Sequence, residues 1–271
     1  MKSITLEVIL KGSFGTLLRE WRSHRGVSQL AMALEAGVSA RHLSFLETGR
    51  ARPSRPMVLR LSATLDLPLR ERNGFLLSAG FAPRFGERPL RSAELDQAFH
   101  AVRLMLDAHE PYPAFALDRY WNIVLWNRPL EALLADITDQ GKSIDEINAL
   151  DLVFEPGLMR ERFLNWEEVA SAVLKRLRRQ VVRAASDERL QETWDRVEAS
   201  PGVAALIREG HHEETPPVLV PMKIRQADQV LTWINTLAVF GATGDVTLDE
   251  LVVESFFPGD ENTRQFVQAA I

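Results

Sequence analysis

The sequence contains no cysteine, which excludes disulfide bonds, thiolate nucleophiles and cysteine-ligated zinc sites. It also has no run of about 18 apolar residues, the length that a membrane-spanning helix needs. The first 13 residues include a short apolar stretch, but neither the apolar core nor the cleavage site of a signal peptide. We therefore expect a soluble protein of the reducing cytoplasm, with no membrane partner.

Motifs of common enzyme sites are absent as well. There is no Gly-x-Ser-x-Gly, no phosphate-binding glycine loop and no His-Glu-x-x-His. The segment His211-His212-Glu213-Glu214 contains metal-ligating residue types, but adjacent side chains on a helix do not face a common ion. We interpret it as an exposed acidic loop and predict no catalytic residue, no metal and no cofactor.

Charged residues are divided unevenly along the chain. Residues 1–82 contain 12 Lys and Arg against 6 Asp and Glu, whereas residues 83–271 contain 20 against 31. The first part therefore carries a net charge of +6 and the remainder −11. This asymmetry favours a polyanionic partner for the first part alone.

Apolar spacing in the first part predicts five short helices. Apolar residues at i, i+3, i+4 and i+7 mark the first helix, and Gly26 ends it. Pro56 begins a fourth helix, and a fifth follows Pro68. The first helix face consists of Phe14, Leu17, Leu18 and Trp21.

The second and third helices meet at a tight turn. Ser28 and Ser39 are suitable N-caps, Gly37 interrupts the chain between the helices, and the third helix is expected to reach about Thr48. This spacing predicts a helix-turn-helix. The second helix is expected to point Leu30, Ala33 and Leu34 inward.

These residues resemble the phage-repressor (Xre/Cro) class of helix-turn-helix domains. The resemblance covers Phe14 to Ala79 and implies that the third helix enters the major groove of double-stranded DNA. It also implies a partly buried salt bridge between Arg22 and Glu47. The alternative is a helical bundle that binds only protein. The markers are Gln29, Ala33, Gly37, Val38, Leu43, Leu46, Glu47 and Gly49.

On the third helix, Val38, Leu43 and Leu46 are expected to face the core, which turns the other side outward. There Arg41 can bind a guanine edge. Phe45 departs from the polar residue that relatives often carry; it is interpreted either as a contact to thymine methyl groups or as packing against the next loop.

The remaining contacts are expected on phosphates. Arg50, Arg52 and Arg55 would set affinity and salt dependence, and Gln29 with the helix start at Ser28 is placed for a further phosphate. The complete predicted DNA-binding set is Ser28, Gln29, Ser39, Ala40, Arg41, Ser44, Phe45, Arg50 and Arg52.

The segment APRFGERPLR, residues 82–91, combines prolines, a glycine and arginines and is typical of a linker. We therefore predict a domain at residues 1–82, a linker at 83–91 and a second domain at 92–271. The second domain begins with a helix from about Ser92 to Ala108.

The second domain is predicted to be α+β. PAFALDRYWNIVLWNRP predicts a β-hairpin that turns at Asp118-Arg119, and a helical pattern runs from Arg128 to about Gly210. VLVPMKIRQ, QVLTWINTLAVFG and DVTLDELVVESFFP then predict three strands, before a closing helix from Asp260. Five antiparallel strands with a long helical insert predict a PAS-like sheet that covers a pocket.

This part resembles the MmyB-like regulators, whose body is a PAS-type ligand-binding domain. The matching features are DRYWNIVLWN at Asp118–Asn127, Asn165-Trp166-Glu167, and Glu254-Ser255-Phe256-Phe257. The resemblance covers most of residues 92–260 and implies a small apolar ligand, fatty-acid-like.

A pocket would lie between a helix and the sheet. Its predicted lining is Trp166, Val169, Val173 and Leu177 from the helix, and Phe115, Trp126, Trp233 and Phe257 from the sheet. For any one of these residues, a place in an ordinary core is the more common role. A ligand carboxylate would need an arginine, and the sequence does not choose among Arg176, Arg179, Arg183 and Arg225.

The leading hypothesis is a ligand-responsive transcriptional regulator that binds a two-fold operator as a homodimer. One alternative keeps the DNA-binding domain and uses the second domain only for dimerisation or protein contacts. Another is an enzyme that acts on its ligand, for which the sequence offers no catalytic set.

Overall fold

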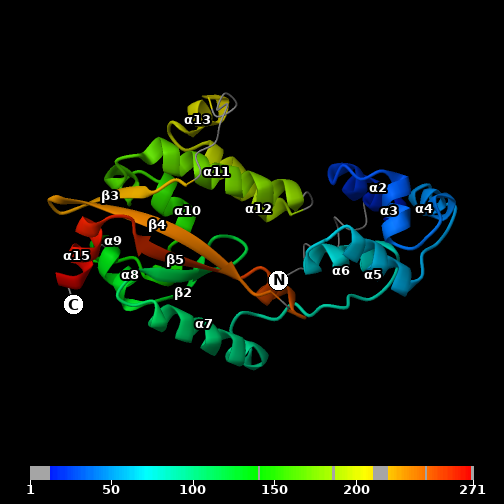
Figure 1. Ribbon diagram of the computed structural model, residues 1–271, viewed down its shortest axis with the longest axis horizontal. Coiled ribbons are helices and arrows are strands. Elements are labelled where there is room, and N and C mark those ends of the chain that lie inside the picture. The colour runs from blue at the N-terminus through cyan, green and yellow to red at the C-terminus, as the bar shows by residue number, and fades with distance from the viewer. Residues whose placement is uncertain (1–12, 140, 185–186, 210–218, 242, 270–271) are drawn as a thin grey trace. The chain divides into compact units, whose positions relative to one another are not determined.

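The computed structural model describes residues 13–139, 141–184, 187–209, 219–241 and 243–269. The chain forms two compact units, the first from residues 13–88 with 243–249 and the second from residues 89–241 with 250–269 (Figure 1). The division predicted from the sequence had assigned residues 243–249 to the second domain. The segment His211–Glu214 lies outside the described residues. Over the described ranges, no helix combines the length and the apolar character needed to cross a membrane.

Five helices make up the described chain from residue 13 to residue 78, as the sequence predicted. Each of the first four follows a serine whose hydroxyl oxygen accepts a hydrogen bond from the backbone N–H three residues later, which satisfies a donor that the helix itself cannot pair. The five are α2 (Phe14–His24), α3 (Gln29–Glu35), α4 (Ala40–Glu47), α5 (Arg55–Thr64) and α6 (Leu69–Ser78).

Two glycines permit the packing of these helices. Gly37 has a φ of +64° in the turn between α3 and α4, a conformation that side-chain-bearing residues disfavour. Gly15 lies where α2 crosses α4, and a Cβ atom there would overlap the carbonyl oxygen of Leu46. The first and third helices of the domain therefore approach to backbone contact.

Two of the three inward predictions for α3 are wrong. Ala33 is buried, but Leu30 and Leu34 are 71% and 82% exposed. Only a narrow face of this seven-residue helix reaches the core, and Met32 and Ala33 occupy it. The core of the first unit includes Phe14, Leu18, Met32, Leu43, Leu46, Val58, Leu61, Phe75 and Leu76.

A short helix from far along the chain completes the first unit. α14 (Val246–Asp249) packs beside α6. The N-cap position of α6 is Pro68, which has no capping side chain, and the Asp249 carboxylate accepts a hydrogen bond from the N–H of Leu69 at 3.2 Å. Three more bonds hold the segment: Val246 N–H to the Gly86 carbonyl at 2.7 Å, Arg88 to the Asp245 carboxylate at 2.8 Å, and the Thr247 hydroxyl to the Arg88 carbonyl at 2.6 Å.

The second unit is built on an antiparallel sheet whose strand order, in the described chain, is β2-β1-β5-β4-β3. The predicted fold class, a helical domain followed by an α+β domain with five antiparallel strands and a helical insert, is confirmed. The strands are β1 (Ala114–Leu117), β2 (Ile123–Trp126), β3 (Met222–Gln226), β4 (Gln229–Val239) and β5 (Val252–Pro258).

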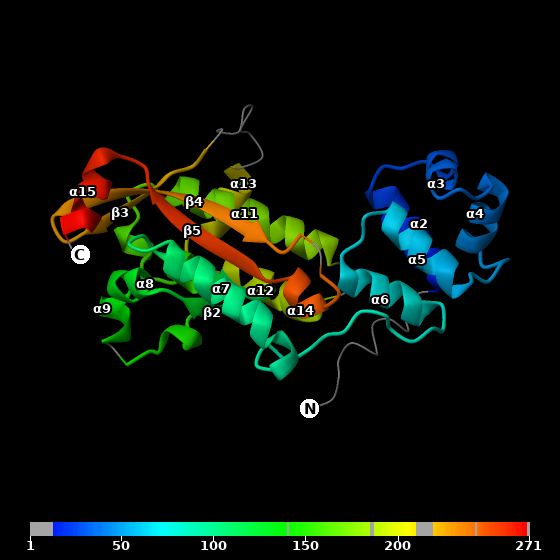
Figure 2. The same ribbon diagram turned by 60° about the horizontal axis from the view of Figure 1, so that its bottom comes forward.

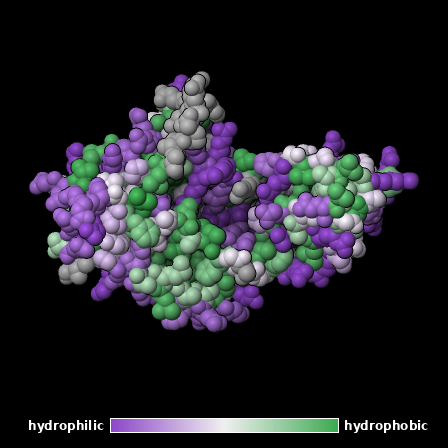
Figure 3. Space-filling view, in the orientation of Figure 1, coloured by the Kyte–Doolittle hydropathy of each residue, from purple (hydrophilic) through white to green (hydrophobic). Residues whose placement is uncertain are grey.

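Helices cover both faces of the sheet (Figure 2). η1 (Ala93–Leu95) is followed by α7 (Asp96–Ala108), which packs on one face. Strand β1 shows the division, because Ala114 and Ala116 face α7 whereas Phe115 and Leu117 face the insert. Figure 3 shows hydrophobic residues on the side that carries α7, where Leu104 and Met105 are exposed.

The helical insert covers the opposite face and contributes most of the larger core. It consists of α8 (Arg128–Leu133), α9 (Ala135–Thr138), η2 (Ile144–Glu146), α10 (Ala149–Phe154), η3 (Arg160–Arg162), α11 (Trp166–Arg183), α12 (Glu188–Glu198) and α13 (Val203–Glu209). The chain closes with α15 (Glu261–Ala269), which packs on β4 and β5. The last strand is shorter than the predicted segment, because residues 246–249 form α14.

Candidate functional sites

The outward side of α4 carries three of the nine residues predicted to face DNA. Leu43 and Leu46 are buried, so the helix turns the exposed Arg41 away from the core, with Ser44 and Phe45 half-buried beside it. Ala40 differs from the prediction, because it packs partly against the core.

Phe45 lies between two arginines. The guanidinium carbons of Arg41 and Arg50 are 5.2 Å and 5.9 Å from the centre of its ring, within the range of cation–π attraction. The half-buried ring thus holds two exposed cations at the same end of the domain. With the exposed Arg52, they form a basic surface that can pair with phosphates and base edges.

Glu47 joins α2, α3 and α4. Its carboxylate accepts hydrogen bonds from Arg22 Nε at 2.6 Å and from Gln29 Nε2 at 2.5 Å. The Arg22 and Glu47 side chains are 13% and 2% exposed, so the predicted partly buried salt bridge is confirmed. Gln29 therefore uses its side-chain amide inside the domain, and Ser28 and Ser39 use their hydroxyl oxygens as N-caps.

A cavity of about 160 Å³ lies between α11 and the sheet of the second unit. Helix α11 contributes residues spaced i, i+3, i+4 and i+7, which is one face of a helix. β1, the β1–β2 loop, β3, β4, β5 and the insert supply most of the rest. Apolar lining residues include Phe115, Leu133, Val153, Val169, Ala172, Val173, Ile224, Trp233 and Phe256.

Polar groups meet on one part of the cavity wall. The Glu254 carboxylate accepts hydrogen bonds from Arg176 Nη1 at 3.1 Å and from Asn235 Nδ2 at 2.6 Å. The Arg176 guanidinium also lies over the Trp121 ring, 4.2 Å from its centre. All four residues line the cavity, so a charge-balanced pair borders an otherwise apolar space.

A strained loop positions Trp121. Its φ of +66° is rare for a bulky residue, and such strain persists only where neighbours enforce it. Asp118 accepts hydrogen bonds from the N–H groups on either side, at Tyr120 and Asn122, at 2.8 Å and 2.9 Å. The Trp121 indole N–H donates to Gln180 Oε1 at 2.9 Å.

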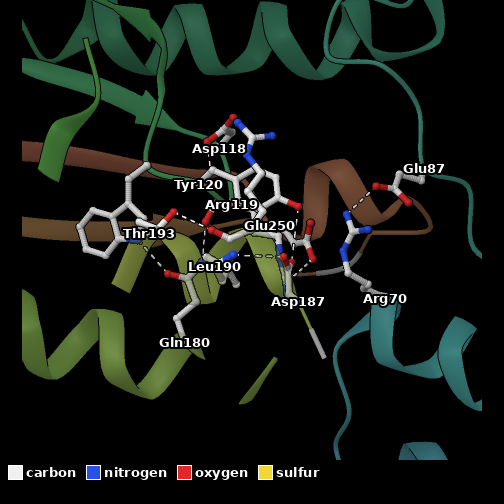
Figure 4. A network of polar contacts seen from close by, with 12 residues as sticks. Arg70, Glu87, Asp118, Arg119, Tyr120, Gln180, Asp187, Leu190, Thr193 and Glu250 are labelled. Atoms are coloured by element: carbon white, nitrogen blue, oxygen red, sulfur yellow. Dashed lines mark hydrogen bonds and ion pairs between the residues drawn. The ribbon is translucent and has the colours of Figure 1, made fainter. Parts of the chain in front are cut away.

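Arg119 anchors the same loop (Figure 4). Its guanidinium binds Asp187 at 2.8 Å and Glu250 at 2.5 Å, and its carbonyl accepts a hydrogen bond from Gln180 Nε2 at 2.6 Å. These bonds connect the β1–β2 loop to α11, to the start of α12 and to the chain before β5. The loop that carries Trp121 is therefore fixed from three sides.

Four of the eight predicted ligand-binding residues line the cavity: Phe115, Val169, Val173 and Trp233. The others lie elsewhere. Leu177 is fully buried in the core, and the indoles of Trp126 and Trp166 donate to Glu131 Oε1 and to the Val153 carbonyl. Phe257 is 42% exposed, because strand side chains alternate and its neighbour Phe256 takes the cavity side.

Among the four candidate arginines, Arg176 lines the cavity. Arg179 and Arg225 are exposed, and the side chain of Arg183 lies outside the described residues. Sequence reasoning missed Trp121, Asn235 and Glu254. The two polar residues interrupt apolar strands, and a polar residue within a buried strand is an informative signal; nothing local distinguished Trp121.

The site can bind but shows no catalytic set. Over the part of the chain that the structure describes, no group of three or more His, Cys, Asp or Glu residues could hold a metal ion. Arg176, Asn235 and Glu254 are already paired with one another, and no nucleophile lies beside a base among the described residues of the cavity wall.

Comparisons with known families match the N-terminal and C-terminal parts of the chain separately. Residues 13–75 match a helix-turn-helix domain, and residues 99–270 match the MmyB-like transcription regulator ligand binding domain. The second match alone covers well over half of the chain. No curated protein matches the chain significantly.

Proposed function

The chain belongs to the MmyB-like transcription regulators, and we propose that it controls transcription in response to a small apolar, fatty-acid-like effector. It is a DNA-binding regulator with a ligand-binding domain. The observation that carries the proposal is the cavity beside α11, whose wall is apolar apart from the paired groups around Glu254.

The cavity volume limits the enclosed part of the effector. Its 160 Å³ is close to the ~150 Å³ of an apolar protein cavity that binds benzene. A short alkyl chain fits this space, as does the end of a longer chain that extends through the mouth.

The proposed DNA contacts are Arg41 to a base edge and Arg50 and Arg52 to phosphates, with Phe45 supporting Arg41 and Arg50. The proposed assembly is a homodimer on a two-fold operator, because helix-turn-helix regulators read paired half-sites in this way. Two measurements test this assembly: the length of DNA that the protein needs for binding, and the molar mass of the purified protein from light scattering.

Native mass spectrometry tests the effector directly. The full chain should carry an adduct of small mass that organic extraction removes, and adding the extract back should change its affinity for operator DNA. Val173→Phe fills the cavity and should abolish the adduct. Val182→Phe is the matched control, because Val182 lies on the same helix and is 45% exposed.

The second candidate function is a dimerisation or protein-binding role for the second unit alone. The exposed Leu104 and Met105 on α7 favour it. It predicts that protein from several hosts carries no adduct and that Val173→Phe leaves DNA binding unchanged. Those two results together would overturn the effector proposal.

A further inference from the structure

Glu254 introduces a buried negative charge into the cavity. It is 8% exposed, and both carboxylate oxygens already accept hydrogen bonds, from Arg176 and Asn235. The positive charge of Arg176 is therefore balanced before any ligand enters. A ligand carboxylate at this place would bring a second negative charge beside Glu254 against one guanidinium, and an unbalanced buried charge is strongly unfavourable.

Trp233 adds a donor without an acceptor. It lines the cavity and is 2% exposed, and its indole N–H has no hydrogen-bond partner among the described residues. Buried donors in native proteins are almost always paired. On β4, Trp233 and Asn235 are two residues apart and share the cavity face, so this donor and the Glu254 group border the same space.

We infer that the cavity selects an uncharged ligand whose polar group accepts hydrogen bonds, such as an amide, ester, ketone or alcohol on an apolar chain, and that Glu254 excludes the corresponding carboxylate. The inference rests on the proposed function, because it assumes that the cavity binds the effector. It narrows a fatty-acid-like effector to one whose acid group is masked or reduced. The indole N–H of Trp233 serves the acceptor, beside the paired Arg176 and Glu254 side chains.

Octanamide and octanoate are the probes, because they have the same chain and nearly the same head shape but differ in charge at pH 7. Calorimetric titration of the full-length protein should give octanamide the tighter binding, by at least about tenfold, because like charges placed side by side in a buried site repel strongly.

Glu254→Gln removes the negative charge and leaves that of Arg176 unbalanced. It should cancel or reverse the preference, so that octanoate binds at least as tightly as octanamide. Glu261→Gln is the matched control, because it makes the same change at an exposed position on α15 and should keep the wild-type ratio. Trp233→Phe should weaken octanamide by about two- to tenfold, the value of one net hydrogen bond.

The results separate two kinds of failure. Tighter binding of octanoate by the wild-type protein would overturn this inference and leave the cavity as an effector site. The inference would also be overturned if a folded Glu254→Gln protein kept the wild-type ratio of octanamide affinity to octanoate affinity. Binding of neither probe would overturn both the inference and the effector proposal. If Glu254→Gln does not fold, the test rests on the affinities of the wild-type protein for octanamide and octanoate and on the affinity of Trp233→Phe for octanamide.

Discussion

Arg41 is the side chain on which base recognition depends in the proposed DNA complex. It is exposed on α4 and positioned over the Phe45 ring. Arg41→Ala should weaken operator binding by about 5- to 150-fold, because a bidentate contact to guanine contributes about 1–3 kcal/mol. Fluorescence anisotropy with operator and scrambled DNA measures the loss.

The expected loss for Arg41→Ala is larger on the operator than on scrambled DNA. Arg208→Ala removes the same charge from the second unit and should change neither. Equal losses on both DNAs would mean that Arg41 contacts phosphates rather than bases.

Loss of Glu47 should strongly destabilise the first unit. Glu47→Ala leaves the Arg22 guanidinium, 13% exposed, without its carboxylate, and breaking a buried pair costs about 3 kcal/mol of unfolding free energy. Urea unfolding followed by circular dichroism measures it. Glu35→Ala changes an exposed glutamate and should stay within about 0.5 kcal/mol of wild type; an equally small effect of Glu47→Ala would contradict the role assigned here.

Single residues were predictable where a regular period fixed their direction. Val169 and Val173 belong to a helical stripe that the sequence shows clearly, and both line the cavity, whereas Trp166 and Leu177 at the ends of that stripe do not. The prediction for Phe257 was wrong because successive side chains of a strand point to opposite faces of the sheet. An error of one position therefore places the side chain on the wrong face. Trp121 could not be predicted, because distant Gln180 holds its loop: Gln180 accepts a hydrogen bond from the indole N–H and donates one to the nearby Arg119 carbonyl.

α6 depends on a capping residue from a remote segment. Asp249 accepts the Leu69 N–H, and Pro68 offers no alternative cap. Asp249→Ala should therefore lower the stability of the first unit by about 1 kcal/mol. Asp249→Asn can still accept the hydrogen bond and should retain most of the wild-type stability. Thermal unfolding of both variants measures the difference. An alanine variant as stable as the wild type would contradict the capping role of Asp249.

At the scale of elements, periodicity predicted the five helices, the hairpin and the helical insert. It failed at α14, because Val246 and Leu248 alternate with polar residues in the same way as a strand. The helix forms there because Asp245 accepts the Thr247 N–H at 2.9 Å and binds Arg88, and Arg88 is too distant in sequence for a local pattern to reveal.

The whole molecule contains a DNA-binding unit that is discontinuous in sequence. A fragment of residues 13–88 lacks the cap on α6 and the Arg88–Asp245 pair. Its melting temperature should fall below that of the first unit in the full chain, by about 4–8 °C for each kcal/mol lost. Differential scanning calorimetry measures this shift.

Joining residues 243–249 to residue 88 through a short Gly-Ser linker should restore the melting temperature of the fragment. A scrambled version of the same segment is the control. A fragment as stable as the unit in the full chain would show that α14 adds nothing.

The charge asymmetry and the two-part organisation were visible in the sequence, because they are properties of composition. The sequence predicted a pocket between a helix and the sheet, but it could not distinguish that pocket from a filled core, because both are built from the same apolar residues. Only the placement of Glu254, Arg176 and Asn235 around one space distinguishes them.

The interrupted first unit also bears on how such regulators diversify. A single genetic crossover near residue 88 would combine a new helix-turn-helix domain with the original α14 segment. In that segment Asp245 and Asp249 bind Arg88 and Leu69 of the original domain. In such hybrids the new domain and the original α14 segment would lack these matched contacts. New operator preferences should therefore arise by gradual substitution on the surface of α4 more readily than by exchange of whole modules.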